Sequence, residues 1–252
     1  MSASKRAARA WKVLGTTDPY FAVLTDPAFH EADRPGPPRE AFFRSGEADV
    51  DKLFGLIAAE HPSFVPRRVL DFGCGVGRLV LPFARRAPEV VGVDVSAAML
   101  DEARKNCAEA GLDNVALLAT DSPELRREGN FDLVHSNIVF QHIPSGEGLR
   151  IVRELVARLN PGGVGALHFV YAIRRSLWWR CIYFARKAIP GVHRVANIAR
   201  GHPAGRPLME MNEYPLAALY ASIHDCGARR ISSILTDHEG FLGAMLIFRK
   251  PE

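Results

Sequence analysis

The sequence contains few cysteines and no long apolar run. Its four cysteines, Cys74, Cys107, Cys181 and Cys226, are widely spaced and form no Cys-x-x-Cys pair. This spacing argues against a disulfide framework or a zinc site and is typical of reduced thiols in the cytoplasm. No apolar stretch approaches the ~20 residues that span a bilayer, and the first ten residues lack the apolar core of a secretory signal. We therefore expect a cytoplasmic protein without a metal site.

Strand and helix patterns alternate along most of the chain. Apolar strands are expected at residues 68–72, 90–93, 115–119, 131–135 and 164–170, with helical patterns between them. Strands that are apolar throughout and separated by helices predict a parallel sheet covered on both faces. Two more strands, at 230–235 and 242–248, are so close in sequence that an antiparallel pair is favoured. The predicted fold is α/β, a Rossmann-like doubly wound mixed sheet of seven strands with an antiparallel last strand.

The chain is long enough for one elaborated domain. Of its 252 residues, 48% are hydrophobic and 24% charged, which is ordinary for a globular protein with a full core. We expect a main domain at residues 61–252 and a helical segment at 1–60 that covers the site. An insertion at 172–207 follows the fifth strand.

A glycine-rich loop follows the first predicted strand. Residues 71–77 read Asp-Phe-Gly-Cys-Gly-Val-Gly and precede a helical pattern. Glycines at alternate positions allow a sharp turn and let backbone N–H groups approach a bound cofactor. The dinucleotide-binding fingerprint is Gly-x-Gly-x-x-Gly, whereas this loop is Gly-x-Gly-x-Gly and begins with an acidic residue.

Several signals in order resemble the class I S-adenosylmethionine-dependent methyltransferases. They are the acidic-x-Gly-x-Gly-x-Gly loop, Asp94 closing the second strand, Asp121 after the third, Phe131-Asp132-Leu133-Val134, and Asn160-Pro161-Gly162-Gly163. The resemblance covers about residues 67–170 and implies S-adenosyl-L-methionine as cofactor and S-adenosyl-L-homocysteine as product. The cofactor-binding residues it implies are Asp71, Gly73, Cys74, Gly75, Gly77, Arg78, Asp94, Val95, Met99, Asp121, Ser122, Asn137 and Ile138. For Asp132 we expect a structural role, and for Asp121 a helix cap is the alternative.

The resemblance implies methyl transfer, and the candidates for catalysis and substrate binding follow the fourth and fifth predicted strands. His142 follows the fourth strand, and its ordinary pKa near 6.5 suits a general base for a hydroxyl acceptor. Packing against the next helix is the alternative for His142. Tyr171, Tyr214 and His238 are expected to bind substrate, although His238 also fits a purely turn-stabilising role.

Two branches of the family carry marks that this chain lacks. An Asn/Asp-Pro-Pro-Tyr/Phe motif, typical of amino-methylating enzymes, would follow the fourth strand, where the chain has Asn-Ile-Val-Phe at 137–140. The Asp-Asn pair of metal-dependent enzymes would follow the fifth strand, where the chain has Val-Tyr-Ala-Ile at 170–173. We expect a metal-independent O-methyltransferase acting on a small or lipid-linked molecule. The alternatives are a non-catalytic binding protein of the same fold and an NAD-dependent oxidoreductase.

The insertion at 172–207 concentrates positive charge. It has eight arginine or lysine residues and no acidic one, so the rest of the chain carries −4 of the total net charge of +4. Trp178, Trp179, Tyr183 and Phe184 lie among them, and a helix is expected from about 176 to 188. The insertion fits a solvated cap, a pocket wall for an acidic acceptor, or a basic amphipathic surface for an anionic membrane. Nucleic acid is the least favoured partner, since no reader motif is present.

Overall fold

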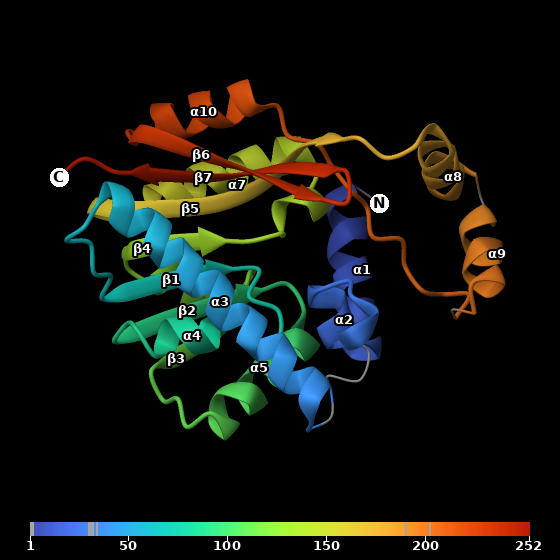
Figure 1. The fold of residues 1–252 in the computed structure, drawn as a ribbon, viewed down its shortest axis with the longest axis horizontal. Coiled ribbons are helices and arrows are strands. Elements are labelled where there is room, and N and C mark those ends of the chain that lie inside the picture. Colours follow the sequence, from blue (N-terminus) through green and yellow to red (C-terminus); the bar gives the residue numbers. More distant parts are fainter. Residues whose placement is uncertain (1–2, 30–32, 34, 190, 202) are drawn as a thin grey trace.

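A seven-stranded sheet forms the centre of the molecule (Figure 1). The structure, a computed structural model, describes residues 3–29, 33, 35–189, 191–201 and 203–252, so parts of the predicted cover and insertion lie outside the described residues. The strand order is β3-β2-β1-β4-β5-β7-β6. The strands are β1 (Arg68–Phe72), β2 (Glu89–Asp94), β3 (Val115–Ala119), β4 (Phe131–Ser136), β5 (Leu159–Ile173), β6 (Arg229–His238) and β7 (Phe241–Arg249).

The pairing of the strands confirms the predicted fold class. β1 to β5 pair with one another in parallel, and β7 is antiparallel to both β5 and β6. β1 shows why its sequence is apolar throughout, since Val69 and Leu70 contribute to separate hydrophobic clusters on opposite faces of the sheet.

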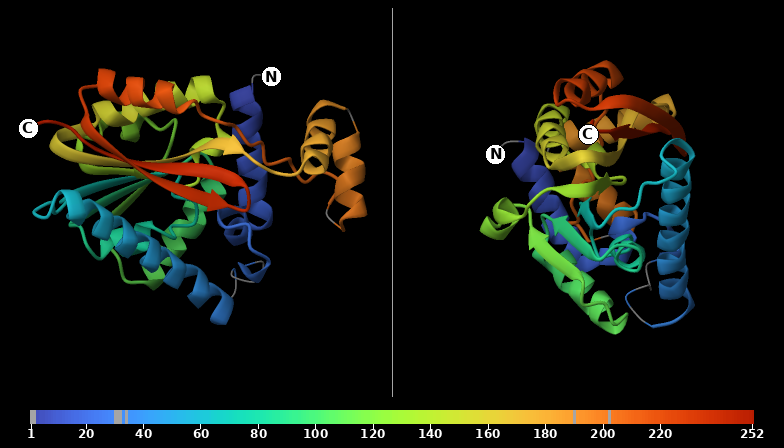
Figure 2. Two further views of the ribbon diagram at one scale, coloured as in Figure 1. Left: turned by 45° about the horizontal axis from the view of Figure 1, so that its top comes forward. Right: turned by 90° about the vertical axis from the view of Figure 1, so that its left-hand side faces the viewer.

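Helices cover both faces (Figure 2). One face carries α3 (Pro37–Glu60), α4 (Val80–Ala84) and α5 (Ala97–Glu109). The other carries α6 (Pro123–Arg127), α7 (Ser145–Ala157) and α10 (Leu216–Asp225). Ser96 caps α5 as expected, because its side chain accepts a hydrogen bond from the Met99 N–H at 3.5 Å.

Several strands extend by one to three residues beyond the expected bounds, and two elements differ more. The helix expected at 78–86 is only Val80–Ala84. β5 begins at Leu159, so residues 160–163, expected as a turn, already belong to the strand. They are held there by the end of the chain, since the Gly162 N–H donates to the Lys250 carbonyl at 3.0 Å and the Lys250 N–H to the Gly163 carbonyl at 2.9 Å.

The N-terminal part packs across the carboxyl ends of the strands. It comprises α1 (Ala3–Thr17), α2 (Pro19–Val23) and a short 3-10 helix (Pro27–Phe29). A third hydrophobic cluster joins Leu14 and Tyr20 to Phe42 of α3, Val76 of the glycine loop and Met99 of α5. Leu14 and Met99 are 85 positions apart in the sequence, so the cover depends on long-range packing.

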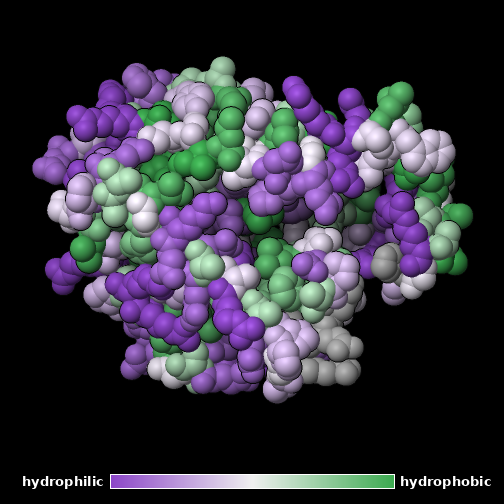
Figure 3. Space-filling model, in the orientation of Figure 1, coloured by the Kyte–Doolittle hydropathy of each residue, from purple (hydrophilic) through white to green (hydrophobic). Residues whose placement is uncertain are grey.

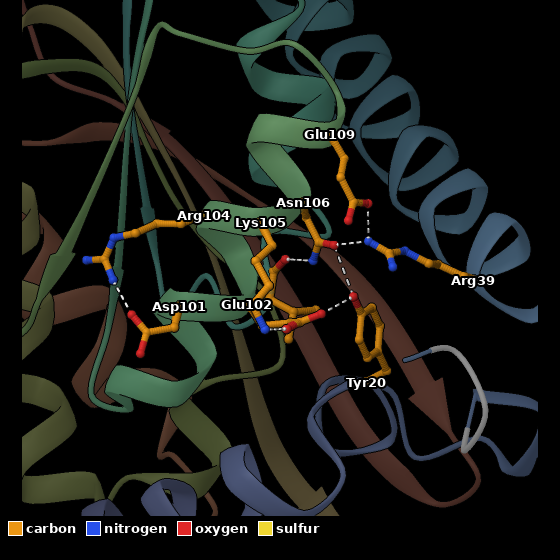
Figure 4. A network of polar contacts seen from close by, with 9 residues as sticks. Tyr20, Arg39, Asp101, Glu102, Arg104, Lys105, Asn106 and Glu109 are labelled. Atoms are coloured by element: carbon orange, nitrogen blue, oxygen red, sulfur yellow. Dashed lines mark hydrogen bonds and ion pairs between the residues drawn. The ribbon is translucent and has the colours of Figure 1, made fainter. Parts of the chain in front are cut away.

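Polar contacts fasten the same cover to α5 (Figure 4). The Tyr20 hydroxyl lies 2.9 Å from Glu102 Oε1 and 3.0 Å from Asn106 Oδ1. Arg39 of α3 reaches Asn106 and pairs with Glu109 at 2.6 Å. Asn106 also donates to the Val76 carbonyl at 2.8 Å, so one buried amide joins α2, α3, α5 and the glycine loop.

The insertion after β5 stands apart from the rest of the fold (Figures 1 and 2). It contains two helices, α8 (Leu177–Ala188) and α9 (Val192–Ala199). The helix expected near 176–188 is therefore present, with Ser176 as its N-cap. Among the described residues, no helix has the length and apolar character needed to cross a bilayer.

Candidate active site

A cavity of about 640 Å³ opens at the carboxyl ends of β1, β2 and β4. The glycine loop, the ends of β2 and β3, and the segment after β4 form much of its wall. Ala7, Ala8 and Trp11 of α1 close another side, and α6 and α7 contribute the rest. In parallel α/β sheets this edge is the usual place for a ligand, and the volume is in the range of small-molecule sites.

Gly73 and Gly75 let the loop pass close to the cavity. Both line it, with φ angles of 79° and 54°. A Cβ on Gly73 would lie 2.3 Å from Val139 Cγ2, and one on Gly75 would lie 2.7 Å from Val23 Cγ2. The turn is closed by the Gly73 N–H, which donates to the Val93 carbonyl at 2.7 Å. The space beside these two residues therefore excludes any side chain.

Asp94 presents its carboxylate to the cavity from the end of β2. Its Oδ2 accepts the Gly75 N–H at 3.0 Å and its Oδ1 accepts the Ser96 N–H at 2.8 Å. Loss of solvent around this group raises the pKa of Asp94, and the backbone hydrogen bonds oppose that shift. These backbone partners do not take every acceptor position of the carboxylate, so Asp94 can still bind hydroxyl donors.

The neighbouring walls are formed by the ends of β2, β3 and β4. Val95, Met99, Asp121, Asn137 and Ile138 all line the cavity, in the positions expected from the sequence. Ser122 does not, because its side chain caps α6 by accepting the Leu125 N–H at 3.1 Å. The capping role considered for Asp121 is thus taken by Ser122, which leaves the Asp121 carboxylate at the cavity.

Ile138 holds an uncommon backbone conformation. Its φ is 60°, which is rare for a β-branched residue and costs free energy. Strain of this kind persists only where the surroundings fix it, and here the strained residue forms part of the cavity wall. Nothing in its sequence neighbourhood predicts the angle.

Four loop residues expected at the cofactor support the loop from behind instead. Asp71, Cys74, Gly77 and Arg78 do not line the cavity. Because side chains alternate along β1, Asp71 points to the opposite face, where its Oδ1 lies 2.8 Å from His135 Nδ1. Cys74 is buried, which raises its pKa well above the ordinary value. Gly77 has a φ of 88° at the end of the loop.

Arg78 fastens the loop to α3. Its guanidinium pairs with Asp49 at 2.8 Å and donates to the Ser45 hydroxyl at 3.1 Å. Between these two residues, a Cβ on Gly46 would lie 2.3 Å from the Arg78 carbonyl oxygen. The helix and the loop are therefore in direct backbone contact, and this support explains why Arg78 is buried away from the cavity.

His142 lies in the cavity wall on the short 3-10 helix Phe140–His142. Its Nδ1 lies 3.0 Å from the Glu210 carbonyl and its Nε2 lies 3.2 Å from Gln141 Nε2. Since a carbonyl only accepts, the proton sits on Nδ1 and the lone pair on Nε2. Burial lowers the pKa of His142 to about 4, so the ring is neutral at pH 7. Trp11 packs edge-on against it, with 4.9 Å between the ring centroids.

The three residues expected to bind substrate do not line this cavity. Tyr214 belongs to the core, where it is fully buried and donates from its hydroxyl to the Ile143 carbonyl at 2.8 Å. Burial raises the pKa of this phenol. Tyr171 packs against the same core cluster, and His238 is exposed near the end of β6. These three residues are therefore not brought together with the cavity residues.

Sequence reasoning missed several wall residues. Trp11 lies in the segment at 1–60 that was expected to cover the site, but neither Trp11 nor Val139 was predicted as a wall residue. α7 contributes Glu147, Arg150 and Glu154, of which Glu147 pairs with Arg150 at 2.5 Å. That pairing lowers the pKa of Glu147. Within the described ranges, no group of three or more His, Cys, Asp or Glu side chains is placed to hold a metal ion.

Comparisons with known proteins agree with the fold and the loop. Residues 69–163 match the family described as "Methyltransferase domain". The matched segment runs from β1 into β5 and contains every cavity residue from Leu70 to Arg158. The resemblance inferred from the glycine loop and the strand ends is therefore confirmed.

Curated relatives match part of this chain and part of their own length. The chain is 38% identical over 135 residues to the 23S rRNA (uracil(1939)-C(5))-methyltransferase RlmD of Alkalilimnicola ehrlichii, covering 51% of this chain and 28% of that protein. It is 32% identical over 142 residues to the ubiquinone biosynthesis O-methyltransferase of a Chelativorans species, covering 56% and 53%. The chain thus spans from about a quarter to a half of the length of these relatives.

A solved structure matches over almost the whole chain. It is the magnesium protoporphyrin IX methyltransferase of Synechocystis PCC 6803 with bound SAM, with a TM-score of 0.58 and 17% identity, covering 96% of this chain and 97% of that one. At this identity the likeness is one of fold. The chain has the Rossmann-like fold of the class I methyltransferases.

Proposed function

We propose that this methyltransferase-fold protein transfers a methyl group from S-adenosyl-L-methionine to a hydroxyl of a small or lipid-linked acceptor. The observation that carries the proposal is that one cavity joins Gly73, Gly75, Asp94, Asp121 and His142. Gly73, Gly75 and Asp94 suit a nucleoside with a free ribose diol. His142 suits an acceptor hydroxyl that must lose its proton during transfer. The Synechocystis structure, crystallised with SAM, and the name of the Chelativorans relative point the same way.

The residues of the cavity fit the cofactor. The Asp94 carboxylate can accept hydrogen bonds from ribose hydroxyls, because its backbone partners do not take every acceptor position of the two oxygens. Asp121 can accept from an adenine amino group, and Val95, Met99 and Ile138 offer an apolar wall. Gly73 and Gly75 line the cavity without side chains of their own, so their backbone can lie close to a bound ligand. The cofactor supplies an activated methyl group on a sulfonium.

Because the methyl donor is already activated, the protein's main tasks are alignment and exclusion of water. α1 contributes to both, since Trp11 and two alanines close the cavity over the sheet edge. A base is needed only where the acceptor loses a proton. His142 Nε2 carries a lone pair, and its only partner in the described structure is the Gln141 amide at 3.2 Å. An acceptor hydroxyl would displace this amide and pass its proton to Nε2.

A small molecule is the acceptor class that the cavity fits best. Its volume of about 640 Å³ must hold cofactor and acceptor together, which leaves room for one ring or chain terminus rather than a folded macromolecule. A lipid-linked acceptor satisfies the same limit, because only its reactive end has to enter. The low pKa of His142 favours acidic hydroxyls such as phenols, whose protons a weak base can still accept.

Calorimetry with S-adenosyl-L-homocysteine and with NAD tests the cofactor. We expect the first to bind and the second not to bind. Asp94→Asn should weaken binding by more than about tenfold, whereas Asp113→Asn, an exposed carboxylate before β3, serves as the matched control. Binding of NAD alone would instead assign the fold to an oxidoreductase.

Turnover is tested with radiolabelled methyl donor and a panel of phenols, polar lipids and nucleotide sugars. We expect label in a hydroxyl-bearing member and formation of S-adenosyl-L-homocysteine. His142→Gln should slow transfer to that acceptor by ~10²-fold while cofactor affinity is kept. An unchanged rate in His142→Gln would remove the histidine from the reaction, and cofactor binding without transfer to any member would favour a binding protein.

A further inference from the structure

Exposed apolar side chains gather on the helical hairpin formed by α8 and α9. Among the described residues, nine large hydrophobic side chains are exposed, and six of them lie between 177 and 198. These six are Leu177, Trp178, Phe184, Ile189, Val195 and Ile198. Leu177 and Trp178 are 76% and 75% exposed, values at which no protein contact shields them. Figure 3 shows hydrophobic residues reaching the outer surface of this outlying part, at the right of the view.

The apolar residues form a continuous outward stripe rather than a scatter. On α8, Leu177, Cys181 and Phe184 follow one another at helical spacing, with Trp178 beside them. The opposite side of α8 contacts the protein: Trp179 packs edge-on against Phe241 of β7 at 5.6 Å between ring centroids, and the Tyr183 hydroxyl accepts the Met211 N–H at 2.8 Å.

The inside of the hairpin is polar. Asn197 of α9 is only 1% exposed and accepts from the Arg186 guanidinium of α8 at 3.1 Å. Asn197 Nδ2 and His193 Nε2 both lie within hydrogen-bond distance of the Arg206 carbonyl, at 2.8 and 2.7 Å. A helix pair in water normally places apolar residues inside and polar ones outside. This hairpin reverses that order, so its outer face is built for surroundings other than water.

Unpaired positive charge surrounds the apolar stripe. Arg174, Arg180, Arg194 and Arg200 are exposed, and no carboxylate of the described chain lies within ion-pair distance of them. Residues 172–207 contain no acidic side chain at all. The other carboxylates near the hairpin, Glu210 and Glu239, are already paired with Lys187 at 2.9 Å and Arg175 at 3.5 Å.

We propose that the α8–α9 hairpin docks the protein on an anionic lipid bilayer, with its apolar stripe in the interface and its free arginines on lipid headgroups. An interfacial segment of this kind combines exposed aromatic and aliphatic residues with flanking cations. A second copy of the chain is disfavoured as occupant, because two hairpins face to face would bring the four unpaired arginines of each copy together.

The hairpin is joined to the cavity by Glu210. The Glu210 carboxylate pairs with Lys187 of α8 at 2.9 Å, and its carbonyl accepts from His142 at 3.0 Å. A docked hairpin therefore holds the cavity close to the membrane surface, where a lipid-linked acceptor would present its headgroup. The docking itself does not depend on methyl transfer, so its test stands apart from that of the proposed function.

The test is flotation of the full chain, without cofactor, on vesicles of phosphatidylcholine with and without phosphatidylglycerol. We expect binding to the anionic vesicles that weakens with added salt. Trp178→Glu with Phe184→Glu should reduce binding by about tenfold or more. The matched control is Val65→Glu with Leu235→Glu, two equally exposed apolar residues outside the hairpin, which should retain binding.

A second pair of variants separates the hairpin's charge from net charge. Arg180→Gln with Arg194→Gln should lower binding to anionic vesicles by about tenfold, whereas Lys52→Gln with Arg67→Gln changes net charge equally on exposed residues elsewhere. If both pairs of variants lost vesicle binding equally, the binding would depend on net charge alone, and the proposal would be overturned.

Direct insertion can be followed at Cys181, the exposed thiol on α8. An environment-sensitive dye on Cys181, in a Cys226→Ser background, should shift to the blue on anionic vesicles. No shift, or equal binding to pure phosphatidylcholine, would overturn the proposal. The proposal would also be overturned if sedimentation showed a dimer in the absence of lipid and Trp178→Glu abolished that dimer. The stripe would then be an interface between copies.

Discussion

Acidification should destabilise this protein through His142, and the size of the effect follows from its surroundings. The ring is buried between Trp11, Gln141 and the Glu210 carbonyl, and burial lowers its pKa to about 4. In the unfolded chain the pKa returns to about 6.5. Between these values the unfolded state binds a proton that the folded state does not, so stability rises with pH and is lost on acidification.

The magnitude can be worked out from the two pKa values. Going from pH 7 to pH 5, linkage predicts that His142 alone lowers the free energy of unfolding by about 2 kcal/mol. His168 adds a similar amount, because it is also buried and its pKa is also lowered to about 4. The folded protein as a whole should therefore lose about 4 kcal/mol over this interval from its two buried rings.

Urea unfolding at pH 7 and at pH 5 measures this loss. His142→Gln should make the pH-dependent loss smaller by about 2 kcal/mol, whatever its effect on stability at pH 7. His224→Gln is the control, since that side chain is 63% exposed and solvent reaches it in both states. A loss that is the same in His142→Gln as in the unaltered protein would refute the burial argument and, with it, the neutral base at pH 5 to 7.

Three further changes probe the cavity and its cover. Asp94→Ala should weaken S-adenosyl-L-homocysteine binding by more than tenfold, about 1.4 kcal/mol or more, measured by calorimetry. Gly73→Ala should lower the free energy of unfolding by about 2 kcal/mol, because the residue has a positive φ and its Cβ would clash with Val139. Gly55→Ala is the control, since Gly55 lies in a helix with open space beside it, and thermal melts compare the two variants. Tyr20→Phe removes the buried hydroxyl between α2 and α5 and should cost about 1 kcal/mol, with faster proteolysis of the first helix as the readout. An unchanged melt, affinity or digestion rate in any of these would contradict the role assigned to that residue.

The sheet could be predicted from the sequence because its signals are local. β1 and β3 have the expected bounds, since each is a short apolar run ended by loop residues. Ser96 was predicted as a cap from its place before a helical pattern, and the structure confirms the hydrogen bond. The start of β5 could not be predicted, because residues 160–163 are held in the strand by Lys250, almost ninety residues further along.

A site residue could be predicted from the sequence where its place along a strand decides whether it lines the cavity. Asp94 ends β2 and Asp121 follows the end of β3, and the carboxyl ends of parallel strands meet at one edge, so both lie at the cavity. Asp71 lies close to the end of β1, but side chains alternate along the strand, and its neighbours Leu70 and Phe72 are the ones that line the cavity. The Asp71 side chain therefore points to the other face, towards His135. Tyr214 could not be placed either, because its burial depends on close approach to Gly148, where a Cβ would lie 1.8 Å from the tyrosine hydroxyl oxygen.

The hairpin illustrates what composition alone leaves open. Eight cations with interspersed aromatics are compatible with an acidic pocket, a solvated cap or a membrane surface. The distinction depends on which side of α8 faces the protein, and the contacts of Trp179 with Phe241 and of Tyr183 with Met211 identify that side. Helical periodicity cannot provide it, because both sides of α8 are rich in apolar residues.

The wall that α1 contributes to the cavity has a consequence for how a ligand comes and goes. Ala7, Ala8 and Trp11 belong to the first dozen residues, yet they touch the same space as the ends of β1 and β2. A molecule occupying that space would bridge the chain's beginning and its central sheet. Occupancy should therefore shield the first helix from proteases, and the more firmly the Tyr20 contacts hold the cover, the more slowly we expect a bound molecule to leave.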